Sequence, residues 1–193
     1  MRGSPTDDRS RVLTSPATSV QTQGHRGREG DVTSTLDQTD FRNALARFAS
    51  GVTVVITRNG SGQFVGFTAS AFSSLSLSPP LILVCIQKDA DCYGAFMEAE
   101  AFTVSILSAG QPDIALRFAT KAIDKLQGTH VVPGPDTGLP RVDGASAWLE
   151  CRTHSRPDGG DHTILIGEVV AAGSSDSEPL LHFNRVFGRF EPA

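Results

Sequence analysis

Apolar and polar residues alternate with a period of two along much of the chain, which is typical of β-strands with one buried face. Turn residues such as the Asn59-Gly60 pair separate the alternating segments. The pattern predicts strands over residues 52–57, 63–72, 81–87, 102–106, 147–154, 162–171 and 181–190. Segment 81–87 is continuously apolar and follows Pro79-Pro80, so we expect it to be buried on both faces.

Only short stretches have the period of a helix. Apolar residues recur at i, i+3, i+4 and i+7 in one of them, at Phe41, Ala44, Leu45 and Phe48. We expect this helix to end at Gly51, a second to cover residues 91–100, and a third to run from Pro112 towards Phe118. A loop rich in proline and glycine follows at 132–140. Several strands with only short helices between them favour a closed antiparallel barrel over a doubly wound sheet.

Segment 66–80 carries a row of small hydroxyl side chains. If the segment is extended, Thr68 and Ser70 share one face. The same alternation continues through three further serines, Ser74, Ser76 and Ser78. Short hydroxyls can bind a flat ligand with polar edges and phosphate oxygens, because they let the ligand approach the backbone closely. A solvent-exposed strand that is rich in serine is the alternative interpretation.

The first 36 residues differ in composition from the rest of the chain. They contain five arginines and four acidic residues, a net charge of +1, and no aromatic residue, whereas the whole 193-residue chain carries −4. A stretch without periodic apolar positions cannot bury enough surface to offset its ordering entropy. We therefore expect residues 1–36 to be a disordered tail and residues 37–193 to form one domain, with order beginning near Asp37.

Composition and missing motifs exclude several classes of protein. The net charge of −4 argues against a nucleic-acid partner, and no apolar stretch is long enough to span a membrane. Cys85, Cys92 and Cys151 form no CxxC pair, so we expect free thiols and a cytoplasmic protein. No GxGxxG motif, phosphate-binding lysine loop, GxSxG elbow or HExxH motif is present, and the histidines are scattered, so we expect no bound metal.

Four blocks of sequence carry a resemblance to a known family. They are residues 41–55 (Phe-Arg-Asn-Ala-Leu through Gly-Val-Thr-Val-Val), 66–81, 160–169 (Gly-Asp-His-Thr-Ile-Leu-Ile-Gly-Glu-Val) and 179–183. In this order they resemble the flavin reductase family, over about residues 37–190. The resemblance implies an antiparallel Greek-key split β-barrel, mainly β with a few short helices. It also implies hydride transfer from NADH to FAD or FMN, with reduced flavin supplied to a partner monooxygenase in aromatic degradation or antibiotic biosynthesis, by a homodimer.

The resemblance also implies which residues contact the flavin. Three of them, Thr68, Ala69 and Ser70, would line the ring and its ribityl chain. Two serines and the following strand would serve the ribityl and phosphate groups, through Ser74, Ser76, Cys85, Gln87 and Lys88. Phe118 and Ala119 would lie against the flavin. Cys85 can equally be a core residue whose backbone alone touches the ligand.

For NADH, the resemblance implies a positioning role for His162, which begins an apolar strand after a glycine-rich loop. Arg42, Arg185, Phe187 and Gly188 are the remaining candidates, and Arg185 would suit a pyrophosphate because a guanidinium makes bidentate bonds. A histidine at the rim of a barrel can also be a mere capping or solvated residue. NADH is preferred over NADPH on family grounds alone.

Three cations, Arg117, Lys121 and Lys125, would share one face if the third helix continued through them. Such a row is ordinarily a solvent-exposed helix face. The alternative is that these cations help to hold a phosphate group of the ligand. Two other functions remain open at this point. One is a flavin-binding module without turnover, and the other is an oxidase that retains its flavin, like the pyridoxamine-phosphate oxidases.

Overall fold

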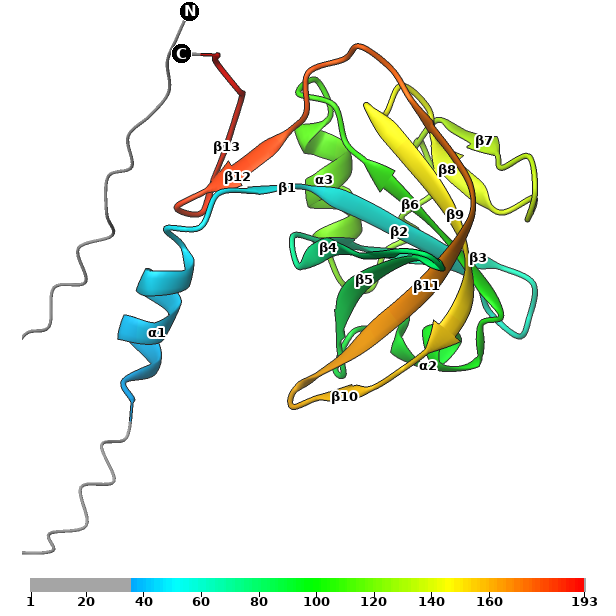
Figure 1. The fold of residues 1–193 in the computed structure, drawn as a ribbon, viewed down its shortest axis with the longest axis horizontal. Helices are drawn as coiled ribbons and strands as arrows, with labels where there is room; N and C mark the ends of the chain where they lie inside the picture. The colour runs from blue at the N-terminus through cyan, green and yellow to red at the C-terminus, as the bar shows by residue number, and fades with distance from the viewer. Residues whose placement is uncertain (1–35, 193) are drawn as a thin grey trace, which may run out of the picture. The chain divides into compact units, whose positions relative to one another are not determined.

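A curled antiparallel sheet is the main element of the computed structural model, which describes residues 36–192 (Figure 1). Seven strands follow one another by hydrogen bonding in the order β3-β2-β6-β9-β11-β5-β4, and β10 pairs with β11. Their bounds are Thr53–Arg58 (β2), Phe64–Ala69 (β3), Phe72–Leu77 (β4), Pro80–Gln87 (β5), Ala101–Ile106 (β6), Ala147–Ser155 (β9), Asp158–Gly159 (β10) and His162–Ser174 (β11). The path is open between β3 and β4, so the predicted barrel is split rather than closed, and the mainly β fold class is confirmed.

Short elements complete the domain. Three helices, α1, α2 and α3, cover Gln38–Leu45, Tyr93–Glu98 and Pro112–Ala119. A three-stranded sheet contains β1 (Ser50–Gly51), β12 (Leu181–Phe183) and β13 (Val186–Gly188), and a hairpin contains β7 (Val131–Pro133) and β8 (Pro140–Val142). None of the helices described between residues 36 and 192 is long and apolar enough to cross a membrane. The expected tail lies outside the described residues except for Leu36.

Several predicted boundaries are wrong for local reasons. The first helix starts after Asp37, whose carboxylate accepts the Thr39 N–H at 2.5 Å, and it ends at Leu45, well before Gly51. The strand expected over 181–190 is two short strands, because Asn184 and Arg185 have positive φ angles of 49° and 67° and make a turn. The expected loop 132–140 is bounded by the β7–β8 hairpin.

The predicted strand over 63–72 is interrupted where the chain turns at Ser70 and Ala71. The Phe72 N–H donates to the Ser70 carbonyl at 3.0 Å, and the Cys85 N–H donates to the Ala71 carbonyl at 3.0 Å. The row of hydroxyls is therefore not continuous, because β3 ends before the turn and β4 has an irregular register at Ser74–Ser76. β5 alternates between buried and half-buried residues, so the expectation of burial on both faces was wrong.

Helix α3 ends at Ala119, because Thr120 is extended with φ −80° and ψ 135°. Lys121 and Lys125 therefore lie in the following loop, and the expected row of three cations on one helix face does not exist. The loop is held by residues that are distant in sequence. The Lys121 ammonium contacts the Asp89 carboxylate at 3.1 Å, and the Ala122 N–H donates to the Asp91 carboxylate at 2.7 Å.

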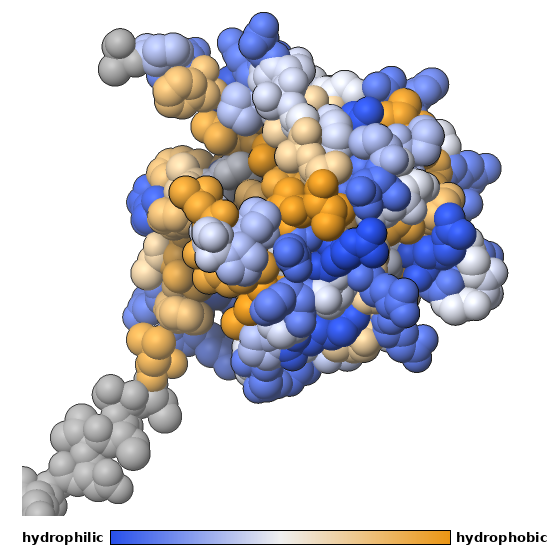
Figure 2. Space-filling view, turned by 45° about the vertical axis from the view of Figure 1, so that its right-hand side comes forward, coloured by the Kyte–Doolittle hydropathy of each residue, from blue (hydrophilic) through white to orange (hydrophobic). Residues whose placement is uncertain are grey.

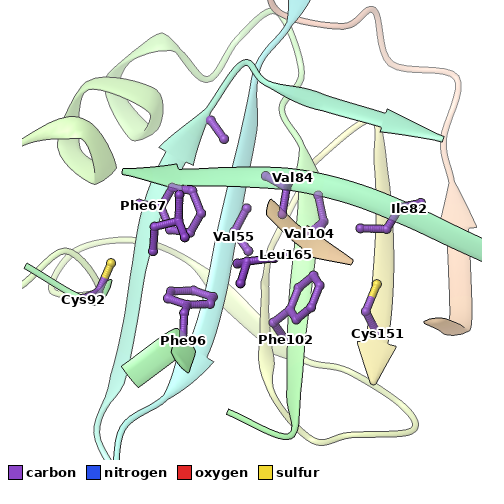
Figure 3. Packing of buried hydrophobic residues seen from close by; sticks show 12 residues of the cluster. Val55, Phe67, Ile82, Val84, Cys92, Phe96, Phe102, Val104, Cys151 and Leu165 are labelled. Carbon is purple, nitrogen blue, oxygen red and sulfur yellow. The ribbon is translucent and has the colours of Figure 1, made fainter. Parts of the chain in front are cut away.

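Two apolar clusters fix the sheet against helices α2 and α3. The first lies inside the curl, where the Phe67 and Phe96 rings meet edge to face with centroids 5.0 Å apart (Figure 3). The second joins β2 to α3 through Val54, Ile56 and Phe118, all of which are fully buried. Removal of this apolar surface from water is the main stabilising term and holds α3 beside β3.

Glu150 is a charged residue that is fully buried on β9, and it holds the loop between β7 and β8. Its carboxylate accepts hydrogen bonds from the Thr137 N–H at 2.6 Å, the Thr137 hydroxyl at 2.5 Å and the Asp136 N–H at 3.3 Å. The loop packs tightly here, since a Cβ atom on Gly134 would lie 2.4 Å from the Glu150 side chain. The carboxylate is therefore a structural group.

We predict that Glu150→Gln lowers the free energy of unfolding by about 2 kcal/mol, because an amide NH2 would face one of these donors and leave it unpaired. Urea denaturation followed by circular dichroism measures the change. Glu168→Gln is the matched control, since Glu168 is exposed on β11 and should change the stability by less than about 0.5 kcal/mol. Equal midpoints for the two variants would refute the structural role of Glu150.

Candidate functional site

A cleft of about 310 Å³ opens beside the end of β3, the end of β5 and the C-terminus of α3, and we call it the β3 cleft. Its walls combine small, aromatic, polar and cationic side chains: Phe67, Thr68, Ala69, Ser70, Ala71, Cys85, Gln87, Ala90, Asp91, Phe118, Ala119, Lys121, Lys125 and His162. Seven of the ten flavin candidates from the sequence line this one cleft. Ser74, Ser76 and Lys88 do not.

The three candidates outside the cleft have other contacts. Ser74 is exposed on β4, and the Ser76 hydroxyl accepts a hydrogen bond from the Ser78 N–H at 3.2 Å. Lys88 lies just beyond β5 and forms an ion pair with Asp158, and this hydrogen bond raises the pKa of Lys88. Because the strand breaks at Ser70 and Ala71, the serines of β4 do not continue the line of Thr68 and Ser70.

Thr68 contributes to the shape of the cleft through a hydrogen bond inside the protein. Its hydroxyl donates to the Ala115 carbonyl at 2.6 Å, which ties β3 to α3. The hydroxyl proton of Thr68 is therefore already engaged, although the hydroxyl oxygen can still accept a hydrogen bond from a ligand. Ser70 is exposed at the end of β3 and has no comparable tie. Of the two hydroxyl side chains that line the cleft, Ser70 is therefore the one that can donate a hydrogen bond to a ligand.

His162 stands on the rim of the cleft at the first residue of β11, directly opposite Gln87 of β5. Its Nδ1 lies 2.7 Å from a carboxylate oxygen of Asp161, and this hydrogen bond lowers the pKa of Asp161. A carboxylate bonded to Nδ1 fixes the orientation of the imidazole ring. Nε2 is then the ring nitrogen that remains available to a ligand. The histidine is half-buried, so its ring is held but remains accessible.

A second cleft, of about 610 Å³, lies beside α1, and we call it the α1 cleft. Arg42 and Arg185 line it together with apolar residues of α1 and β4, and the Arg185 guanidinium donates to Asn43 at 2.8 Å. Phe187 and Gly188 line neither cleft, and the Phe187 ring instead packs on His182 with centroids 5.7 Å apart. The NADH candidates therefore divide between the two clefts and the β13 strand.

The two clefts meet at Ser70 and Ala71, which line both of them. Ser70 and Ala71 both have small side chains, so neither adds bulk where the two clefts meet. Two substrates can thus bind in adjacent spaces with their reacting atoms close together, which is the arrangement that a transfer between them requires.

The sequence did not identify Ala71, Ala90 or Asp91 as lining residues, and no pattern distinguishes them from ordinary turn residues. Lys121 and Lys125 were considered only as members of a helix face, yet both line the β3 cleft. The sequence feature that could have identified them is the position of two cations shortly after Phe118-Ala119, which the resemblance placed at the flavin. Within residues 36–192, no cluster of three or more histidine, cysteine or acidic residues could hold a metal ion.

The three cysteines are free and none is an activated thiolate. Burial raises the pKa of the Cys85 and Cys92 thiols, and it raises that of Cys151 to about 12, with the Glu150 charge adding to the effect. Nucleophilic thiols have a lowered pKa instead. Cys85 is half-buried in the β3 cleft, whereas the other two are buried.

We predict that iodoacetamide labels Cys85 before the other two cysteines, because Cys85 is half-buried on the β3 cleft whereas Cys92 and Cys151 are buried. A ligand in the β3 cleft should slow the labelling about tenfold at about ten times its Kd. Peptide mapping by mass spectrometry measures the rate, and Cys85→Ser is the control for the assignment of the labelled peptide. Labelling that a bound flavin leaves unchanged would place the flavin elsewhere.

Comparison with known proteins identifies the relatives of this chain. A family model described as a flavin reductase like domain matches residues 45–191. The chain is 41% identical over 152 residues to the FMN reductase (NADH) of Agrobacterium fabrum, covering 78% of this chain and 84% of that protein. It is 38% identical over 165 residues to the reductase component of 4-nitrophenol 4-monooxygenase/4-nitrocatechol 2-monooxygenase of Rhodococcus opacus, covering 84% and 86%.

Among solved structures, the NADH:FAD oxidoreductase of Streptomyces globisporus, in complex with NAD and FAD fragments, has the same fold with a TM-score of 0.76. Its sequence is 39% identical to this chain, and the alignment covers 81% of this chain and 94% of that one.

Proposed function

Because the chain belongs to the flavin reductase-like family, we propose that it transfers hydride from NADH to FAD or FMN and supplies the reduced flavin to a partner monooxygenase. The relatives that are named as reductases and reductase components support this activity. The observation that carries the proposal is that the β3 cleft and the α1 cleft share Ser70 and Ala71. A flavin in the first and a nicotinamide entering from the second would meet there.

The β3 cleft suits a flavin in several respects. Ala69, Ala71 and Ala119 leave room for a planar ring to lie against the backbone, and the buried Phe118 packs behind this wall. Lys121 and Lys125 can offset phosphate charge, while Ser70 and Gln87 offer neutral donors. The seven flavin candidates that line this cleft remain our assignment, and Ser74, Ser76 and Lys88 are no longer part of it.

For NADH, we assign the α1 cleft with Arg42 and Arg185, whose guanidinium groups suit a pyrophosphate. His162 is a positioning residue at the rim. Hydride passes from C4 of the nicotinamide to N5 of the flavin, so the protein's contribution is to hold the two rings in contact. Phe187 and Gly188 are not assigned a contact, because neither lines the β3 cleft or the α1 cleft.

We further infer that the protein is a homodimer. No residue of α1 is buried, and Phe41, Leu45 and Phe48 are 49%, 58% and 78% exposed. Figure 2 shows hydrophobic side chains gathered on the left of the view, the side from which α1 extends in Figure 1. An isolated helix of eight residues is marginal in water, so a second copy that covers α1 would stabilise it and complete the α1 cleft. Light scattering should then give twice the mass of the chain.

The free thiols also support our expectation of a cytoplasmic location.

NADH oxidation at the nicotinamide absorbance band, with free FAD or FMN added, tests the activity. Rapid turnover with release of reduced flavin is the expected result. A tightly bound flavin without NADH oxidation would instead indicate a binding module. A retained flavin that only another small molecule reduces would indicate an oxidase of the pyridoxamine-phosphate oxidase type. Either of these results would overturn the proposal.

A further inference from the structure

A third cleft, of about 440 Å³, lies beside the hairpin that joins β2 to β3, and we call it the hairpin cleft. One wall is formed by residues 63–66 and the other by the loop of residues 123–126. Asp91 and Lys125 line both this cleft and the β3 cleft, so the two spaces adjoin. The hairpin cleft, the β3 cleft and the α1 cleft thus follow one another, with the β3 cleft in the middle.

The two ends of the β3 cleft are well separated. The α1 cleft joins it at Ser70 and Ala71, at the end of β3. The hairpin cleft joins it near Gly66, whose carbonyl accepts a hydrogen bond from the Lys125 ammonium at 3.1 Å. Gly66 and Ser70 are about 13 Å apart along an extended strand. A long ligand in the β3 cleft can therefore meet a second substrate at its Ser70 end. Its other end then lies at the hairpin cleft.

The walls of the hairpin cleft have the character of a site for an aromatic base. Phe64, Val65, Ile123 and Leu126 supply apolar surface. The acidic groups of the cleft are already engaged, because the Asp91 carboxylate accepts the Ala122 N–H and the Asp124 carboxylate accepts the Leu126 N–H at 3.1 Å. Backbone donors thus hold both carboxylates, and the apolar side chains supply the surface beyond the junction with the β3 cleft.

Lys125 stands at this junction and is half-buried. An ammonium group has three donors, and Gly66 uses one of them, which leaves two for phosphate oxygens. A cation at this point would contact the linkage between two nucleotide halves. Lys121, by contrast, lines only the β3 cleft and pairs with Asp89.

We infer that the hairpin cleft binds the adenosine half of FAD, with Lys125 at the pyrophosphate, and that the chain consequently binds FAD more tightly than FMN. This inference rests on the proposed function, because it needs the isoalloxazine ring in the β3 cleft. The adenosine of NADH is the other source of the same chemistry. It is less suitable here, since NADH would enter at the Ser70 end.

Calorimetric titration of the full chain with FAD and with FMN, without NADH, tests the inference. The wild type should bind FAD about tenfold more tightly than FMN, a difference of about 1.4 kcal/mol. Ile123→Glu places a charge in the hairpin cleft and should bring the two affinities to about the same value by weakening FAD alone. Leu116→Glu is the matched control, since Leu116 is also exposed but lines none of the three clefts, and it should preserve the preference.

Lys125→Gln gives a second and independent measurement. It should reduce the preference for FAD, whereas Lys121→Gln should weaken both flavins alike. Equal affinities of the wild type for FAD and FMN would overturn the inference. So would an unchanged preference in Ile123→Glu accompanied by weaker binding of ADP-ribose, which would assign the cleft to NADH. Failure of the wild type to bind either flavin would instead refute the proposed function itself.

Discussion

Replacing Ala71 by tryptophan is expected to lower kcat/KM for NADH about 100-fold, because displacement of reacting groups by about 1 Å can have this cost. Ala71 is exposed and lines both the β3 cleft and the α1 cleft. An indole at this position would occupy the space in which the nicotinamide has to meet the flavin. The loss should appear in hydride transfer measured by anaerobic rapid mixing, with a smaller change in flavin affinity.

Two variants make this prediction specific. Ala71→Ser should retain most of the activity, because a hydroxyl adds little volume. Ala172→Trp introduces the same indole at an exposed position of β11 that lines neither cleft, and it should leave hydride transfer unchanged. Wild-type rates in Ala71→Trp would mean that the nicotinamide reaches the flavin by another route.

Replacing Gly66 by alanine is expected to lower the free energy of unfolding by about 3 kcal/mol, at the upper end of the usual cost of overpacking a core. Gly66 is buried in β3 opposite Ile56. A Cβ atom there would lie 2.5 Å from the Val55 carbonyl oxygen and 3.0 Å from the Phe118 ring. The carbonyl belongs to a central strand and cannot move away cheaply. Urea denaturation measures the loss.

The same substitution should also weaken flavin binding, since Phe118 lines the β3 cleft and would be displaced. Gly60→Ala is the control on the same hairpin, because a Cβ atom at Gly60 has no neighbour within 4 Å. Its stability should stay within about 0.5 kcal/mol of the wild type. If Gly66→Ala were equally stable, the packing of β3 against β2 and α3 would differ from that described.

The strands were predictable because the alternation of buried and exposed side chains is local information. The break at Ser70 and Ala71 was not, since small residues fit an extended strand and a turn equally well. The conformation of the segment with the cations after α3 could not be predicted from local sequence either. Their spacing suited a helix, but contacts from Asp89 and Asp91, about thirty residues earlier in the chain, hold the segment as a loop.

The site was predictable in part, and the resemblance to a family contributed most of that part. Thr68, Ala69, Ser70 and Phe118, which the resemblance gave as flavin contacts, lie together on the β3 cleft. No pattern in the sequence could have shown that Arg42 and Arg185 line one cleft, because the packing of α1 beside the β12–β13 turn brings them together. Ser74 and Ser76 do not line this cleft, because the chain turns after β3.

Titration of the purified chain with FAD, followed by the quenching of flavin fluorescence, tests the central claim most directly. The account predicts saturable binding of one flavin per chain, and loss of this binding when Ala119→Arg fills the β3 cleft. Fluorescence that stays unchanged throughout the titration, or that Ala119→Arg does not affect, would contradict the assignment of this cleft to the flavin.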